Sequence, residues 1–178
     1  DMLGYLPQEF GYTPGFTAND FMLYIASIKG LPPRFAKRKT KELLKLVNLE
    51  KDAGRKIRTF SGGMKRRLGI AQALLNDPKI LILDEPTAGQ DLIGINRLEN
   101  ILTELKKENK TVVTITHDME FAVNNFKKIF VMSHKNLLRV GNAKEIFSDD
   151  ELLKDSMLKK TYIGDLCDRL NLNETAVT

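Results

Sequence analysis

Apolar side chains recur at helical spacing through the first half of the chain. This pattern predicts a helix over residues 17–28, a second helix that ends near residue 47, and a third that follows Ser61. Glycine, proline and asparagine residues between these segments predict the turns that separate them. We therefore expect residues from about 15 to 76 to form a mainly helical region.

Short runs of apolar and β-branched residues predict strands on either side of this region. The runs are residues 4–7, 80–83, 111–116 and 129–132. A helix over about residues 92–107 separates two of them. Strands that alternate with helices predict a parallel sheet, and strands that are apolar throughout predict that both faces of the sheet are covered. The predicted fold class is α/β, followed by a tail of two or three short helices whose last residues, 171–178, are frayed.

The composition is that of an ordinary globular protein, with 42% hydrophobic and 29% charged residues among 178. No apolar run approaches the roughly 18 to 20 residues that span a bilayer, so a membrane role would need other subunits. The net charge of +5 comes from 28 basic residues dispersed among 23 acidic ones, which favours a solvated surface over a nucleic-acid interface. The single cysteine, Cys167, excludes an internal disulfide and gives no sign of a zinc cluster.

Two adjacent carboxylates end the apolar run at residues 80–83. Ligand-binding groups collect at the carboxyl ends of strands in α/β sheets, so Asp84 and Glu85 are candidates for a site. Because side chains alternate along a strand, the two carboxylates face different ways. One can hold Mg²⁺ while the other acts as a base toward an attacking water, which is the pattern of a Walker B strand.

Ser61, Gly62 and Gly63 open the third predicted helix. Ser61 is a natural N-cap, and the two glycines let backbone N–H groups approach a phosphate without obstruction by a Cβ atom. A bare Ser-Gly-Gly would more often be only a capped helix start. Here the motif stands within residues 60–68 and is followed by residues 71–74 and then the Walker B strand, and this combination favours an anion site.

Together these motifs resemble the ABC ATPase family, a P-loop NTPase fold, over essentially the whole chain. Residues 61–65 match the family's signature motif, with Met64 where glutamine is more usual, and the Walker B strand follows at a similar spacing. The resemblance implies that two ATPase domains pair head to tail. Ser61, Gly62 and Gly63 would then bind, in trans, the γ-phosphate of the ATP that the other domain holds.

Three further positions match motifs of the family. Gln8 corresponds to the Q-loop glutamine, which approaches Mg²⁺ and connects the site to the helical insertion. Asp91 corresponds to the D-loop aspartate, which aligns the facing sites, and is also a plausible N-cap of the next helix. His117 corresponds to the switch histidine that contacts the γ-phosphate. The resemblance thus implies catalytic roles for Glu85 and His117, and binding of Mg²⁺ by Asp84 and Gln8.

The Walker A pattern G-x-x-x-x-G-K-[ST], whose glycines and lysine cradle phosphates, does not occur in the sequence. In the family this loop lies upstream of Gln8, and the chain begins with Asp1 rather than methionine. Both observations predict a truncated N-terminus that lacks the first strands, and we expect the 178-residue chain alone to be inactive. We predict four regions. Residues 1–14 form a core strand and the Q-loop, and residues 15–76 form a helical subdomain with the signature motif. Residues 77–142 form the α/β ATPase core with Walker B, D-loop and switch histidine, and residues 143–178 form a helical tail.

The resemblance implies the ATP-hydrolysing subunit of a transporter, with ATP and Mg²⁺ as cofactors, peripheral to the cytoplasmic face of the cell membrane. The implied partners are transmembrane subunits and a second ATPase subunit or domain, identical or different. Residues 4–75 resemble ATPases of drug and peptide exporters, whereas residues 90–153 resemble energy-coupling-factor importers, so the cargo and the direction of transport stay open.

Two alternatives to a transporter subunit remain. One is a soluble ABC-type ATPase that acts on nucleic acid or ribosomes, and the other is a non-catalytic regulatory half. The sequence contains neither a coiled-coil insertion nor a second ATPase domain, and it retains Glu85 and His117. The transporter ATPase is therefore favoured, and no nucleic-acid partner is expected.

Overall fold

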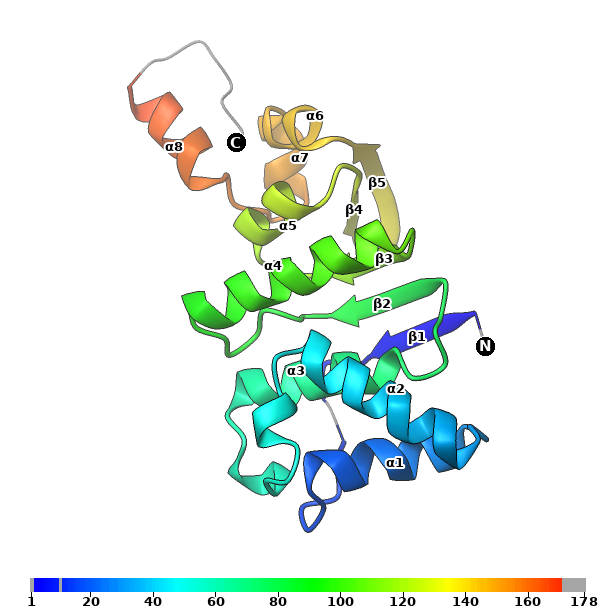
Figure 1. Cartoon of the computed structure of the whole chain (residues 1–178). Coiled ribbons are helices and arrows are strands. Elements are labelled where there is room, and N and C mark those ends of the chain that lie inside the picture. Colours follow the sequence, from blue (N-terminus) through cyan, green and yellow to red (C-terminus); the bar gives the residue numbers. More distant parts are fainter. Residues whose placement is uncertain (1, 10, 171–178) are drawn as a thin grey trace. The chain divides into compact units, whose positions relative to one another are not determined.

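The computed structural model describes residues 2–9 and 11–170, and the chain divides into two units, Asp1–Thr116 and His117–Thr178. The first unit holds a parallel sheet with helices, and the second holds a β-hairpin with short helices (Figure 1). The boundary falls inside the range 77–142 that was predicted as the ATPase core, and the four-part division stays a prediction. None of the helices in the described ranges has the length and apolar character needed to cross a membrane.

Helices dominate the first unit between its first and second strands, as predicted. They are α1 (Ala18–Ile28), α2 (Pro33–Leu46) and α3 (Gly62–Ala73), with two 3-10 turns at Glu50–Asp52 and Ile57–Thr59. Thr17 caps α1 because its hydroxyl accepts a hydrogen bond from the Asp20 N–H at 3.1 Å, and the Asp20 carboxylate accepts one from the Thr17 N–H in return. The buried face of α1 differs from the apolar repeat in the sequence, since Tyr24 and Ile28 are exposed.

The sheet of the first unit has three parallel strands in the order β1 (Leu3–Leu6), β2 (Ile80–Asp84) and β3 (Thr111–Ile115). Helix α4 (Leu92–Lys107) connects β2 to β3 with the bounds that the sequence predicted. The parallel α/β sheet is confirmed. Parallel strands end at the same edge, so this order brings the segments that follow β1, β2 and β3 together.

The prediction that both faces of this sheet are covered is wrong for the described residues. One face is buried, and it carries Leu6, Leu81 and Leu83. The alternate positions are open, with Tyr5 49% and Ile115 54% exposed. The physical reason is that α3 packs against the buried face, where a Cβ atom at Gly4 would lie within 2.5 Å of the Ala73 carbonyl oxygen, while no described element of this unit covers the alternate positions.

The second unit contains one strand, β5 (Asn136–Gly141), that the sequence pattern did not predict. The predicted strand β4 (Ile129–Ser133) pairs with β5, and the pairing is antiparallel. His134 and Lys135 both have positive φ, 49° and 63°, which matches the two-residue turn that favours a hairpin. His134 lies exposed in this turn.

The described part of the second unit, residues 117–170, also contains four short helices. They are α5 (Met119–Asn125), α6 (Ala143–Phe147), α7 (Asp150–Asp155) and α8 (Tyr162–Arg169). The predicted tail of two or three short helices is confirmed by the last three, and the predicted fraying of residues 171–178 lies outside the described residues. The unit has its own apolar core, formed by Val123, Val131, Ile146, Phe147, Leu152 and Leu153.

Candidate functional site

The carboxyl edge of the parallel sheet collects three of the predicted site residues. Leu6 pairs with Leu83, so the chain leaves β1 and β2 at the same level. Gln8 follows β1 in an exposed bend, and Asp84 and Glu85 end β2. The sheet therefore brings Gln8 and both carboxylates to one edge, where α/β proteins bind ligands.

The two carboxylates have different surroundings. Asp84 lies on the open face of the sheet and accepts a long hydrogen bond, 3.5 Å, from the Tyr5 hydroxyl. Glu85 follows the last residue of β2 and has a φ of +47°, a conformation that non-glycine residues rarely adopt. Its N–H donates to the Ile115 carbonyl at 2.8 Å, and its Oε2 accepts a hydrogen bond from the Thr116 hydroxyl at 3.4 Å. The two side chains are thus suited to different roles.

Asp84 and Gln8 can bind a hard divalent cation at this edge only together with oxygens from phosphate or water. Among the residues that the structure describes, no group of three or more His, Cys, Asp or Glu side chains is arranged to hold a metal. Asp84 offers a carboxylate and Gln8 an amide oxygen, both of which are hard ligands. Mg²⁺ is usually bound by one or two carboxylates together with phosphate oxygens and water, and this edge fits that mode.

The signature segment lies at the N-terminus of α3. Ser61 caps the helix, because its Oγ accepts a hydrogen bond from the Met64 N–H at 3.2 Å. Ser61 and Gly62 are exposed, whereas Gly63 is buried. A Cβ atom at Gly63 would lie 3.1 Å from Oε1 of Gln90, so glycine allows the start of α3 to lie close to the segment before α4. Free helical N–H groups at such a start favour an anion.

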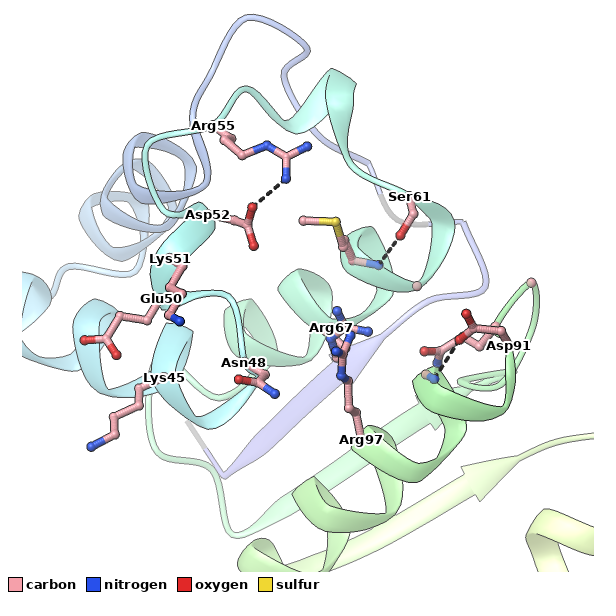
Figure 2. Close-up of a pocket in the computed structure, with 15 residues that line it drawn as sticks. Lys45, Asn48, Glu50, Lys51, Asp52, Arg55, Ser61, Arg67, Asp91 and Arg97 are labelled. Atoms are coloured by element: carbon pink, nitrogen blue, oxygen red, sulfur yellow. Dashed lines mark hydrogen bonds and ion pairs between the residues drawn. The ribbon is translucent and has the colours of Figure 1, made fainter.

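A polar cavity of about 740 Å³ opens beside this helix start (Figure 2). Ser61, Gly63 and Asp91 line it, so the structure brings the predicted signature and D-loop residues together. Basic side chains contribute much of the remaining wall, from Lys45, Lys51, Arg55, Arg67 and Arg97. The cavity therefore combines a helix N-terminus with an excess of positive charge, as an anion site requires.

Arg67 is the most enclosed cation of this cavity. Arg67 is 4% exposed, and its Nε donates to the Val47 carbonyl at 3.1 Å. Burial lowers the pKa of the Arg67 guanidinium, and the nearby charge of Arg97 lowers it further, while Asp91 and Asp52 oppose the change. Figure 2 shows the side chains of Arg67 and Arg97 close together in the cavity. An anion placed there would relieve their mutual repulsion.

The D-loop segment and the start of α4 form one part of the wall of this cavity. Asp91 is the N-cap of α4, since its Oδ1 accepts a hydrogen bond from the Gly94 N–H at 2.7 Å. The N-cap interpretation of Asp91 is therefore confirmed. Gln90 donates its side-chain amide to the Pro86 carbonyl, and its Oε1 is buried without a hydrogen-bond partner among the described residues. The amide of Gln90 fills the space that Gly63 and Gly94 leave open.

His117 is the first residue of the second unit and lies exposed in a bend after β3. The following residue, Asp118, caps α5 through a hydrogen bond from the Phe121 N–H at 3.0 Å. His117 and the sheet edge that carries Glu85 thus belong to different units, and each is described by itself. Its contact with a γ-phosphate stays a prediction.

Sequence reasoning assigned no role to three residues that contact the predicted site. Arg66 donates to the Glu85 carbonyl, the Thr116 hydroxyl donates to the Glu85 carboxylate, and Gln90 packs beside Gly63. A signal for Arg66 was present, because it stands in a helix whose following residues are mostly apolar, and a charged residue there must find partners inside. Nothing in the sequence distinguishes Thr116 from other residues at the end of a predicted strand, or Gln90 from other loop residues.

Comparisons with known proteins indicate the family of the chain. A family model described as ABC transporter matches residues 1–88. The energy-coupling factor transporter ATP-binding protein EcfA of Methanocaldococcus jannaschii is 34% identical over 142 residues, which are 80% of this chain and 51% of that protein. The linearmycin resistance ATP-binding protein LnrL of Bacillus subtilis is 33% identical over 162 residues, 91% of this chain and 51% of that protein.

A solved structure supports the same assignment. It is a dimeric ATP-binding cassette in a post-hydrolysis state, bound to ADP and Pi, and it matches with a TM-score of 0.70 and 28% identity over 80% of this chain and 63% of that one. The chain spans about half the length of the curated relatives that it matches. Similarity to both EcfA and LnrL agrees with the mixed resemblance found in the sequence. The chain has a P-loop NTPase fold and belongs to the ATP-binding proteins of ABC transporters.

Proposed function

We propose that the protein containing this chain is the ATP-hydrolysing subunit of an ABC transporter and that Glu85 is its general base. The observation that carries the proposal is the local structure of Glu85, a carboxylate held in a left-handed conformation after a strand that is buried on one face, and directly after Asp84. Such strain persists where the surrounding structure fixes it, and it concentrates at functional sites.

In this proposal Glu85 takes a proton from a water molecule as the water oxygen attacks the γ-phosphorus. The bond from that phosphorus to the bridging oxygen of ADP breaks, which yields ADP and inorganic phosphate. The hydroxyl of Thr116, which donates to Oε2 of Glu85, orients the carboxylate. His117, exposed after β3, contacts the γ-phosphate.

Asp84 and Gln8 are the residues of this chain that would hold Mg²⁺ at the sheet edge. The cation, when bound, neutralises charge on the phosphate oxygens. Asp84 is suited to this because its carboxylate ends β2 on the open face and accepts only the long hydrogen bond from Tyr5 that the structure shows. Gln8 supplies its oxygen from an exposed bend that leads toward the helical region.

Ser61, Gly62 and Gly63 act on the nucleotide of a second ATPase subunit. Ser61 and Gly62 are exposed, Ser61 and Gly63 line the 740 Å³ cavity, and its basic wall favours phosphate oxygens. The bound dimer in the related cassette structure supports a paired arrangement, which we extend to this protein. Asp91 lies in the same cavity and aligns the two subunits. The primary phosphate clamp of the Walker A type comes from residues outside these 178, since the pattern does not occur among them.

Transmembrane subunits are the partners through which this ATPase moves a substrate, and it works at the cytoplasmic face of the membrane. The names of EcfA and LnrL support this assignment, since one belongs to a transporter and the other to a drug-resistance system. Their difference leaves the substrate and the direction of transport open. No observation favours the nucleic-acid or ribosome alternative.

The test uses the full-length protein purified with its transmembrane subunits and reconstituted in lipid vesicles. We expect Mg-ATP hydrolysis to be stimulated by the transmembrane subunits and unaffected by added DNA, RNA or ribosomes. A control with the subunits omitted gives the basal rate. Stimulation by nucleic acid or ribosomes, without any effect of the transmembrane subunits, would refute the transporter assignment.

A further inference from the structure

Arg66 connects two segments of the site that are far apart in the sequence. It lies in the second turn of α3 and is 7% exposed. Its Nη1 donates to the Pro7 carbonyl at 2.6 Å, and its Nη2 donates to the Glu85 carbonyl at 3.0 Å. One planar guanidinium therefore holds the backbone next to Gln8 and the backbone of the proposed base at the same time.

The surroundings of Arg66 show that these two bonds are its main compensation for burial. A buried charge is unfavourable unless hydrogen bonds and opposite charges surround it. Burial lowers the pKa of the Arg66 guanidinium, while the charges of Asp84 and Glu85 oppose the change. The rigid fork of a guanidinium fixes both the distance and the orientation of two acceptors, which a lysine ammonium cannot do.

The conformation of Glu85 makes the bond from Arg66 consequential. With a φ of +47° the residue stays left-handed only if its neighbours hold it there. Its N–H donates to the Ile115 carbonyl at 2.8 Å, and its own carbonyl accepts hydrogen bonds from Arg66 at 3.0 Å and from the Ala88 N–H at 3.1 Å. Of these three bonds, the one from Arg66 is the only one from a side chain, and its loss would let the carboxylate turn away from its working direction.

We propose that Arg66 is a positioning residue that couples the Q-loop segment to the base Glu85. The same helix carries Ser61, Gly62 and Gly63 at its N-terminus, so Arg66 would pass a displacement of α3 on nucleotide binding to both Pro7 and Glu85. The proposal rests on the proposed ATPase function. It adds a physical link between the signature helix, the segment that leads to the helical region, and the hydrolytic carboxylate.

The test compares Arg66→Met with Arg66→Lys in the full-length protein, and Lys110→Met serves as the matched control. Lys110 is also a largely covered cation, 10% exposed, which joins distant segments by donating to Asp77 at 2.6 Å and to the Pro78 carbonyl at 3.3 Å. It does not contact Pro7 or Glu85. The measured quantities are kcat, the Kd of a non-hydrolysable ATP analogue, the melting temperature, and hydrogen exchange of peptides covering residues 3–9 and 83–88.

We expect Arg66→Met to lower kcat at least tenfold while the Kd changes less than threefold, and Arg66→Lys to recover part of the rate. Hydrogen exchange should accelerate in both peptides for Arg66→Met and in neither for Lys110→Met, at a similar loss of melting temperature. Unchanged exchange in both peptides, or a kcat within twofold of wild type, would overturn the proposal. If Arg66→Met does not fold, Arg66→Gln, which keeps one donor group, carries the same comparison.

The exchange measurement also separates this proposal from the proposed function. A wild-type protein that does not hydrolyse ATP would refute the ATPase function, whereas the exchange of the two peptides would still decide whether Arg66 holds both segments.

Discussion

Gly4 is the position where a single methyl group should most directly test how β1 is held. An ideal Cβ atom at Gly4 would lie 2.5 Å from the Ala73 carbonyl oxygen, 2.9 Å from Cγ of Pro78 and 3.1 Å from a methyl of Leu81. The first of these obstacles is backbone at the end of α3, so it cannot rotate away. Restoring a contact of about 3.5 Å requires β1 and α3 to separate by about 1 Å.

The free-energy cost of Gly4→Ala follows from this separation. Overpacking of a filled site costs about 1 to 3 kcal/mol, and a backbone obstacle places this case in the upper half of that range. Replacing glycine lowers the entropy of the unfolded chain and returns about 0.4 to 1 kcal/mol. We therefore expect a net destabilisation of about 2 kcal/mol, which corresponds to a fall of about 1 M in the urea midpoint for a typical slope of about 2 kcal/mol/M.

Urea unfolding of the full-length protein, followed by circular dichroism, measures this effect. Gly15→Ala is the matched control, because no atom lies within 4 Å of a Cβ at that position and the change in midpoint should be small. The displaced β1 should also lengthen the hydrogen bond from Arg66 to Pro7 and lower the ATPase rate. A Gly4→Ala midpoint equal to that of Gly15→Ala would refute the described packing of β1 on α3.

Three further predictions concern the signature segment, the loop before β2 and the isolated chain. Ser61→Arg should weaken ATP-driven association, because a long side chain would stand where a facing phosphate must approach; unchanged association in light scattering would contradict a role in trans. Asp77→Asn should destabilise the protein at pH 7 by less than about 1 kcal/mol, since Asp77 is largely exposed. The hydrogen bond from Lys110 lowers the pKa of Asp77, so the stability difference between wild type and Asp77→Asn should shrink as pH falls through that lowered pKa. A stability difference that does not change with pH in acid titrations would contradict the ion pair of Asp77 and Lys110. The 178-residue chain alone should not bind Mg-ATP with a micromolar Kd in calorimetry, because it contains no Walker A pattern; such a Kd would show that the main nucleotide site is misplaced.

Local patterns in the sequence were enough to predict the elements that carry the site. Helix α4 was predicted with its observed bounds, because Asp91 is a strong N-cap and a clear apolar repeat follows it. Strand β2 was predicted because four apolar residues precede Asp84, and the capped start of α3 because serine precedes two glycines. These features depend on a few neighbouring residues, which the sequence contains.

Features that depend on tertiary packing could not be predicted in this way. Strand β5 is nearly all exposed, and only the positive φ of His134 and Lys135 shows the turn that pairs it with β4. Whether a face of the sheet is covered depends on which elements pack against it, and the apolar runs of the strands do not specify this. The two bonds of Arg66 join residues from three separate segments, so no spacing in the sequence indicates them.

Phosphate release by full-length Glu85→Gln in its complex tests whether Glu85 is the base of an ATP-hydrolysing site. Glutamine keeps the shape of the side chain but cannot accept the proton of water, while the residues proposed to hold ATP are unchanged. We predict that phosphate release falls by at least a hundredfold and that the Kd of ATP stays within threefold of wild type. A rate of phosphate release within tenfold of wild type would contradict the assignment of Glu85.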